Sequence, residues 1–227
     1  MKEGHFTLLD EEYGRLMERV TSMFSAKEIP YVVVGGSGIQ VAITSALTQN
    51  GKVSTAQKKY ELRGLLRATD DIDMAVKAER LDVGNALQEL TASDPTLDIN
   101  LPYDHAPTVS IQPKEGSPKR VHLNIQTNQT EFKGLTAWYD EIIAGGRSLT
   151  ISYNNHPGFQ VVVAEPEFLI ASKLTRARPK DIVDIFNLLN VLNKNQVHRD
   201  RIKEILARCD KLGCMVTLDS ILADLQN

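Results

Sequence analysis

The first periodic segment of the chain has apolar residues at intervals of three and four, which is the spacing of one helix face. Asp10 precedes this segment and can serve as its N-cap, whereas Pro30 disfavours helical geometry at the residue before it. The pattern therefore predicts a helix between these two positions. Its apolar face consists of Tyr13, Leu16, Met17, Val20, Met23 and Phe24.

A short apolar run and a cluster of glycines follow. Residues 31–34 are YVVV, residues 35–38 are GGSG, and IQVAITSAL comes directly after them. Glycine clusters between periodic segments form turns, and a short apolar run bounded by turn signals is typical of a buried strand. We therefore expect a strand, a glycine turn and a second helix over residues 31–47.

Strict alternation begins in the segment DDIDMAV. Ile72 and Met74 fall on one face of an extended chain, and Asp71 and Asp73 fall on the other. A period of two is typical of a half-buried strand. The polar stretch before it, residues 48–63, is expected to be a surface excursion.

Further strands and helices follow. LDVGNALQELTA is expected to be helical, and VSIQP, RVHLNIQT, TISYN and FQVVVA are expected to be strands. After Ala164 the segments are helical, beginning with EPEFLIASKLTRAR, where Pro166 suits a first helical turn. A helix starting at Pro179 is predicted to bury an apolar stripe of Ile182, Ile185, Phe186 and Leu189.

These elements define the expected architecture. The sequence predicts a mixed α/β (α+β-like) core with a small mixed sheet over residues 1–160. A C-terminal helical region is expected over residues 161–227.

The composition excludes some classes of protein. Among 227 residues, 26 are basic and 29 acidic, for a net charge of −3, which argues against a protein that coats nucleic acid by bulk charge. No apolar stretch approaches the roughly 20 residues that cross a bilayer, and the acidic, amphipathic N-terminus is unlike a signal peptide. Cys209 and Cys214 form no CxxC pair, so we expect reduced thiols in a cytoplasmic protein with no membrane partner.

The alternating aspartates are the first candidate for chemistry. Side chains two apart in a strand point the same way, so Asp71 and Asp73 project side by side. Two carboxylates on one face suit Mg²⁺, which takes hard oxygen ligands and often combines one or two carboxylates with substrate phosphates. The alternative is that both aspartates form the solvated side of an edge strand.

The glycine cluster is the second candidate. Gly35, Gly36 and Ser37 stand between a predicted strand and a predicted helix, where small residues expose main-chain N–H groups and the positive end of the helix to a phosphate. A tight turn that needs glycine for its backbone angles is the alternative. Other phosphate and nucleophile motifs fail here, since Val41 breaks a dinucleotide fingerprint, Ile39 breaks a nucleophile elbow, and no P-loop run exists.

A strand ending in Gly-Gly-Ser, followed by an Asp-x-Asp strand, resembles the polymerase-beta-like nucleotidyltransferase superfamily. The segments RATDDID and PEFLIASKLTRARPKDIVDIFNLL sharpen this resemblance to the AbiEii-type nucleotidyltransferase-like toxin family. In that family an Arg-x-Thr/Ser-x-Asp-Ile-Asp strand is followed by a lysine-containing helix and a Lys-Asp-x-x-Asp segment. The resemblance spans about residues 31–190 and is specific in three short blocks.

The resemblance implies a nucleoside triphosphate site. Gly36 and Ser37 would cradle the β- and γ-phosphates of a triphosphate such as ATP, and Gly35 would belong to the same nucleotide-binding site. Asp71 and Asp73 would hold Mg²⁺ (or Mn²⁺), which lowers the cost of charge on the transferred group and the leaving pyrophosphate.

The resemblance also implies roles for residues outside these two segments. Lys173 would reach the triphosphate, and Asp184 would lie nearby, orienting a basic side chain or the acceptor hydroxyl. Arg67 and Thr69 precede the strand and either position phosphate or simply end the polar excursion. Surface placement is the alternative for Lys173 and for the charged pair of Lys180 and Asp181.

Two features depart from the superfamily pattern. Its third carboxylate is expected at Asn124, which is no useful base, and His122 on the same predicted strand face is a candidate to take the proton. The 35 positions from Gly36 to Asp71 are more than the superfamily's usual gap. The surplus is the polar excursion, either a solvated loop or a basic arm that contacts nucleic acid, with Lys52, Lys58, Lys59, Arg63 and Arg67.

The resemblance thus implies a transferase that moves a nucleotide to a hydroxyl acceptor on RNA (tRNA in related toxins). It also implies the toxin of a toxin–antitoxin pair, with a cognate antitoxin protein as partner. One alternative is a catalytically impaired nucleotide-binding or regulatory module, in keeping with Asn124. Another is a small-molecule nucleotidyltransferase acting on an antibiotic or sugar, since fold does not fix the substrate.

Overall fold

The computed structural model describes residues 8, 10–49, 64–69, 71–100, 108–111, 119–127, 139–151, 158–192 and 197–225. The polar excursion and its predicted basic arm therefore lie outside the described residues, apart from Thr48, Gln49 and Arg67. Within the described part, no helix is long and apolar enough to cross a membrane.

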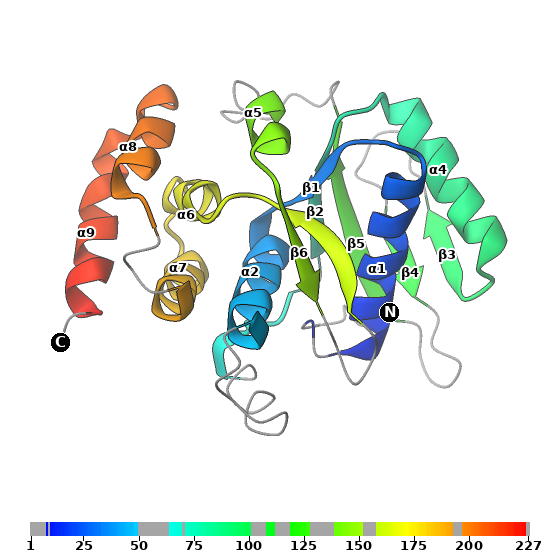
Figure 1. Ribbon diagram of the computed structural model, residues 1–227, viewed down its shortest axis with the longest axis horizontal. Helices are drawn as coiled ribbons and strands as arrows, with labels where there is room; N and C mark the ends of the chain where they lie inside the picture. The colour runs from blue at the N-terminus through cyan, green and yellow to red at the C-terminus, as the bar shows by residue number, and fades with distance from the viewer. Residues whose placement is uncertain are drawn as a thin grey trace.

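A seven-stranded mixed sheet forms the centre of the molecule (Figure 1). Its order is β3-β4-β5-β2-β1-β7-β6, and β2 lies between β1, which is antiparallel to it, and β5, which is parallel. The strands are β1 (Tyr31–Val33), β2 (Asp71–Val76), β3 (Leu97–Asn100), β4 (Thr108–Ile111), β5 (Lys119–Gln126), β6 (Arg147–Ile151) and β7 (Phe159–Val163).

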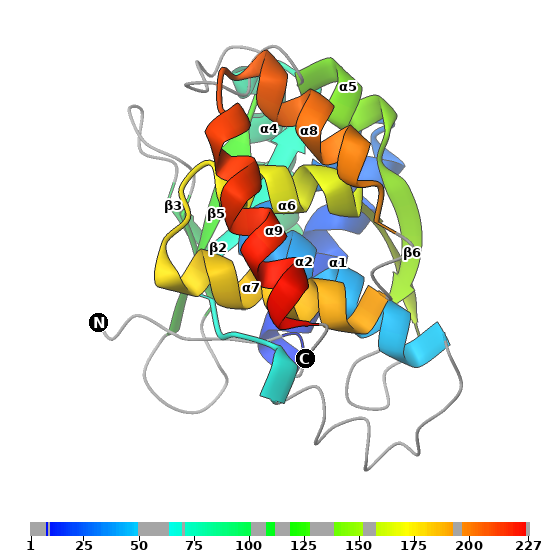
Figure 2. The ribbon, with the colours of Figure 1, turned by 90° about the vertical axis from the view of Figure 1, so that its left-hand side faces the viewer.

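Helices pack around this sheet and extend from one side of it. In the first part of the chain they are α1 (Glu11–Ala26), α2 (Gly35–Gln49), α4 (Arg80–Ser93) and α5 (Tyr139–Ala144). After β7 every described element is helical: α6 (Pro166–Leu174), α7 (Pro179–Leu192), α8 (Arg199–Arg208), the 3-10 helix η3 (Leu212–Cys214) and α9 (Met215–Asp224). These last helices gather on one side of the sheet, with α9 crossing in front of α6 and α7 in Figure 2.

Helix α2 connects the sheet to the C-terminal helices. It packs against β2 on one side and against α6 and α7 on another. Its buried residues include both apolar side chains, such as Ile39 and Ile43, and polar ones, such as Ser37. The first turn of α2 is therefore fixed by both the sheet and the helices that follow β7.

Most of the predicted elements are confirmed, and several details are corrected. The predicted glycine turn is itself the first turn of α2, because the Gly38 N–H already donates to the Val34 carbonyl at 2.8 Å. Helix α6 ends at Leu174 rather than running through TRAR, and Ala177 then takes a φ of 45° before Pro179 opens the next helix. Strand β3 and helix α5 were not predicted.

The buried face of α7 differs from the predicted stripe. Phe186 is 37% exposed, and Ile182 is only partly buried. The buried positions are instead Asp181, Asp184, Ile185, Leu188 and Leu189. Two carboxylates thus share the face of α7 that is turned toward the protein interior.

Candidate active site

Asp71 and Asp73 lie on an interior strand of the sheet. Strand β2 is paired on both sides. The alternative interpretation, in which the two aspartates lie on an edge strand, is therefore wrong. Both aspartates are partly exposed, while Ile72 and Met74 are fully buried. Aspartate is depleted in strands. Packing alone therefore gives no reason for an interior strand to carry two aspartates on its exposed face.

The carboxylate of Asp73 lies against the first residue of α2. Gly35 has a φ of 62°, and a Cβ placed on it would overlap the Asp73 carboxylate. The contact follows from the antiparallel register of β1 and β2, which pairs Val33 with Met74, and from the 2.9 Å hydrogen bond of the Val34 N–H to the Asp73 carbonyl. Glycine is required at position 35 both by this backbone angle and by this close approach.

Ser37 ties the same helix to the same strand. The Asp73 N–H donates to Ser37 Oγ at 3.0 Å, and the Ser37 hydroxyl donates to the Val34 carbonyl, also at 3.0 Å. Ser37 is fully buried. Its side chain thus has an evident structural role, and contact of Ser37 with phosphate stays a prediction.

Strand β5 adds two polar side chains beside the aspartates. The parallel register pairs Asp71 with His122 and Asp73 with Asn124. Asn124 Nδ2 donates to Asp73 Oδ1 at 3.0 Å. Asn124 therefore lies beside Asp73. It occupies the position at which the superfamily resemblance predicts a third carboxylate.

The donor set of this site fits a small hard cation shared with phosphates. Across the described ranges, no group of three or more His, Cys, Asp or Glu side chains could hold a metal ion by itself. The pair of Asp71 and Asp73 corresponds to the one or two carboxylates that Mg²⁺ uses when substrate phosphates supply other ligands. An ion here would thus depend on the substrate for part of its coordination.

Arg67 and Thr69 border the second glycine of α2. A Cβ placed on Gly36 would lie 3.2 Å from Arg67 Nη2 and 3.6 Å from Thr69 Oγ1. Thr69 Oγ1 also accepts a 3.3 Å hydrogen bond from the Asp71 N–H. The structure therefore gathers the segment before β2 and the N-terminal turn of α2 in one place.

Lys173 and Asp184 meet in a buried ion-pair cluster. Lys173 is 2% exposed, and its Nζ lies 2.7 Å from Asp184 Oδ2 and 3.3 Å from Asp181 Oδ1. Arg67 binds the other side of Asp184 through two parallel hydrogen bonds of 3.0 Å. Lys173 thus joins Arg67 and two carboxylates, and contact of Lys173 with a triphosphate stays a prediction.

Asp181 belongs to this cluster and not to the surface. It is fully buried and accepts hydrogen bonds from the Arg178 side chain and from Lys173, with Arg176 Nη2 at 3.6 Å. Burial raises the pKa of Asp181, but these cations outweigh that effect and lower the pKa to about 2. The interpretation of Asp181 as a surface residue is therefore wrong. Positions 181, 184, 185 and 188 are spaced to share one helix face, and this spacing could have predicted that Asp181 is buried.

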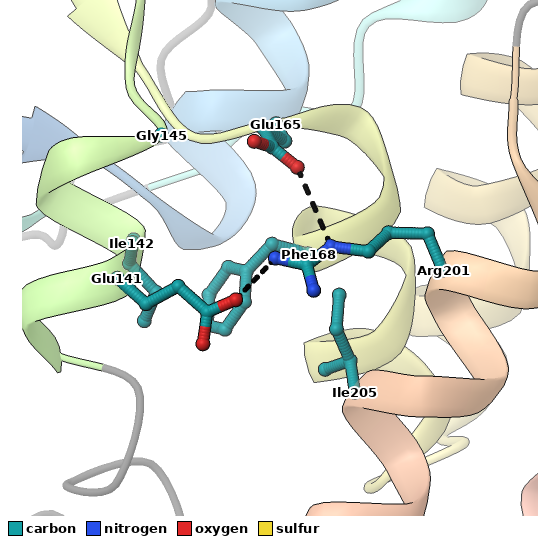
Figure 3. Close-up of a pocket in the computed structure, with 7 residues that line it drawn as sticks. All are labelled: Glu141, Ile142, Gly145, Glu165, Phe168, Arg201 and Ile205. Atoms are coloured by element: carbon teal, nitrogen blue, oxygen red, sulfur yellow. Dashed lines mark hydrogen bonds and ion pairs between the residues drawn. The ribbon is translucent and has the colours of Figure 1, made fainter.

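A separate small pocket lies where α5, α6 and α8 meet (Figure 3). Arg201 of α8 points into it and pairs with Glu141 of α5 and with Glu165, which precedes α6. Apolar side chains of Phe168 and Ile205 line it as well. The pocket shares no residue with the aspartate site, and its charges pair with one another across the junction of three helices.

Comparison with known proteins identifies the fold. No protein-family model matches the chain, and no curated protein matches its sequence. Among solved structures, an antigenic nucleotidyltransferase-like protein from Paracoccidioides brasiliensis is similar over 96% of this chain and 95% of that chain, with 18% identity and a TM-score of 0.57. This chain has a nucleotidyltransferase-like fold.

Two other solved structures are more distant. The antibiotic-resistance factor ANT(2'')-Ia is 14% identical over 93% of this chain and 97% of that chain, with a TM-score of 0.47. A CCA-adding enzyme in complex with ATP is 12% identical over 87% of this chain and 47% of that chain, with a TM-score of 0.34. These two similarities support no conclusion about this chain, and activity has to be argued from the site itself.

Proposed function

We propose that this chain is a metal-dependent nucleotidyltransferase that moves a nucleotide from a nucleoside triphosphate to a hydroxyl acceptor. The observation that carries the proposal is the placement of the Asp73 carboxylate against Gly35, at the N-terminal turn of α2. Helix N-termini attract phosphate through unpaired N–H groups and the helix dipole. A carboxylate pair at the same place would bring a divalent cation to those phosphates.

Each residue of the site has a proposed role. Asp71 and Asp73 would hold Mg²⁺ or Mn²⁺ together with phosphate oxygens. When bound, the ion would offset the negative charge that develops on the transferred group and the leaving pyrophosphate. The main chain at Gly35 and Gly36 would bind the β- and γ-phosphates, and Arg67 borders the same turn.

Two aspartate variants test the proposal directly. Asp71→Asn and Asp73→Asn keep the size of the side chain and an oxygen that can accept hydrogen bonds, so the fold should persist. We expect both to lose transfer of radiolabel from triphosphates to RNA or protein in the presence of Mg²⁺. Asp82→Asn, an exposed change in the first turn of α4, is the matched control, and wild-type transfer rates in both site variants would refute the metal assignment.

RNA is the proposed acceptor, on the strength of the resemblance to AbiEii-type toxins, in which tRNA is modified. A toxin role would add a cognate antitoxin protein as a partner. Expression of the wild-type chain should then arrest growth, and Asp73→Asn should relieve the arrest. A normal growth curve for cells that express the wild type would remove the toxin role but not the transferase activity.

Asn124 favours a second candidate, a nucleotide-binding module without transfer. The amide beside Asp73 brings no negative charge and no base. Such a module would bind triphosphate in a Mg²⁺-dependent way and form no product with any acceptor. Turnover with a purified RNA pool would eliminate this candidate.

A further inference from the structure

We propose that Arg67 is the side chain that contacts the triphosphate at the N-terminal turn of α2, and that Asp184, Lys173 and Asp181 are positioning residues that hold Arg67 there. The inference rests on the proposed function and identifies the positively charged side chain of its phosphate site. It differs from the expectation that Lys173 itself reaches the triphosphate.

Arg67 is oriented by three of its five N–H groups. Nε and Nη2 donate to the two oxygens of Asp184, each at 3.0 Å, and Nη1 donates to the Ala68 carbonyl at 3.0 Å. One N–H on Nη1 and one on Nη2 are left by these bonds. Nη2 lies against Gly36, where a Cβ would be 3.2 Å away, so the guanidinium edge borders the helix turn proposed to receive phosphate.

The exposure of the pair gives each partner a different role. The Arg67 side chain is 28% exposed, whereas the Asp184 side chain is 5% exposed. A guanidinium held from its buried side by a bidentate carboxylate presents its remaining donors in a fixed plane, which suits the oxygens of a phosphate. Asp184 would therefore act on the substrate only through Arg67.

Lys173 completes the positioning rather than reaching outward. The residue is 2% exposed, and its ammonium lies 3.3 Å from Asp181 and 2.7 Å from Asp184. Moving it to a phosphate would take a buried positive charge away from both carboxylates, and Asp184 would then have only Arg67 and Asp181 only the exposed arginines as cationic partners, which is unfavourable. The lysine instead pairs with Asp184 from the buried side, so that this carboxylate can remain buried beneath Arg67.

The arrangement also links the two parts of the chain. Arg67 precedes β2, whereas Lys173 is on α6 and both aspartates are on α7. Helix α2 packs against α6 and α7, as Figure 1 shows for α7. The C-terminal helices would thus set the position of a phosphate-binding side chain that belongs to the core.

The test measures Mg²⁺-dependent binding of ATP and of inorganic tripolyphosphate by calorimetry. We expect Arg67→Ala and Asp184→Asn each to weaken binding of both probes by at least tenfold, and the double variant to be no weaker than either single variant. Arg67→Lys, which keeps the charge but loses the planar fork, should also weaken binding. A merely structural Asp184 would lower thermal stability and leave the affinity of the folded protein unchanged.

A matched control is available on the C-terminal helices. Arg199 and Asp219 form a bidentate pair of similar geometry, with bonds of 3.0 and 2.9 Å, but both side chains are about half exposed. Asp219→Asn should bind both probes like the wild type. If Asp184→Asn does not fold, Asp184→Glu replaces it, because the longer side chain keeps the charge and displaces Arg67.

The outcomes separate this inference from the proposed function. One outcome is that Asp73→Asn loses Mg²⁺-dependent binding while Arg67→Ala or Asp184→Asn binds like the wild type. In that case the positioning scheme, in which Asp184 holds Arg67 at the phosphate, is wrong and the proposed metal site is retained. Additive losses in the double variant would show that Arg67 and Asp184 act independently and would also overturn the scheme. If the wild type binds neither probe, the proposed function and this inference both fall.

Discussion

Asn124 donates a hydrogen bond from its Nδ2 to Oδ1 of Asp73, at a distance of 3.0 Å. The contact follows from the parallel register of β2 and β5, in which these two residues are direct neighbours. An amide that donates to a carboxylate holds it in place without repulsion, whereas a second carboxylate there would need a cation between the two. The identity of residue 124 therefore determines how much negative charge the site carries.

Asn124→Asp should supply a third carboxylate and raise the rate of the proposed nucleotide transfer. General-base assistance contributes roughly 10²- to 10⁴-fold in enzymes, so we expect an increase of about tenfold or more in label transfer at saturating Mg²⁺. Without Mg²⁺ the new carboxylate repels Asp73, and the thermal midpoint should fall. A rate equal to or below the wild-type rate would show that position 124 does not limit the chemistry.

Gly35→Ala should disrupt the site by two independent routes. The φ of 62° is unfavourable for alanine, and its Cβ would overlap the Asp73 carboxylate. We expect a loss of about 1–3 kcal/mol in unfolding free energy and the loss of Mg²⁺-dependent triphosphate binding, measured by chemical denaturation and calorimetry. Gly213→Ala is the control, since a Cβ there meets nothing within 4 Å, and equal effects of the two changes would contradict the packing argument.

Local patterns in the sequence were sufficient to predict the unit of β1, α2 and β2. The alternation around Asp71 and Asp73 placed both on one face, and the apolar run before Gly35 predicted the strand that leads into α2. Their approach to each other could not be derived from local spacing, because it depends on the antiparallel pairing of β1 and β2. Strand pairing at this sequence separation is set by tertiary packing rather than by periodicity.

The buried charges were the main failure of prediction. Lys173 and Asp181 were open to a surface reading, because charged side chains are almost never fully buried unless they are paired. Their pairing joins α6 to α7 and, through Asp184, to Arg67, which lies 117 positions earlier in the chain. Strand β3 and helix α5, of four and six residues, were also missed.

The hydroxyl of Tyr139, away from the candidate site, is expected to stabilise the sheet. Its hydroxyl accepts a 2.9 Å hydrogen bond from the Val76 N–H and contacts the carbonyl oxygens of Val76 and Gln126. It therefore bridges β2 and β5 just beyond the paired aspartate and asparagine. Tyr139→Phe should cost about 1–3 kcal/mol of unfolding free energy, because buried main-chain groups lose their partner. Tyr31→Phe is the control, since its ring contact with Phe24 is retained.

Alkaline titration gives a second measurement of the same hydroxyl. Burial, partly opposed by the main-chain hydrogen bond to Val76, raises the pKa of Tyr139 to about 12. Between pH 10 and 12 the unfolded chain has lost this proton and the folded chain retains it, so stability should fall as the pH rises. Tyr139→Phe should show a smaller fall over that range, and an identical slope in both proteins would contradict the assignment.

The low pKa of Asp181 determines how the unfolding free energy should depend on pH in acid. Burial raises its pKa, but the Arg178 hydrogen bond and the charges of Lys173 and Arg176 more than offset this and lower the pKa to about 2. The unfolded chain takes up the proton near pH 4, before the folded chain does, so the stabilisation is complete above pH 4 and is lost as the pH falls toward 2. Removing one partner of a buried ion pair costs about 3–5 kcal/mol.

Asp181→Asn should therefore be less stable than the wild type at neutral pH, and the difference should shrink as the pH falls from 4 to 2. Urea unfolding at a series of pH values measures both quantities. Asp219→Asn, on the half-exposed side chain of α9, is the matched control and should change unfolding free energy by about 1 kcal/mol or less. A difference between wild type and Asp181→Asn that stays constant from pH 7 to pH 2 would mean that Asp181 is not ionised within the cluster, and the charge compensation assigned to Lys173 would then need another source.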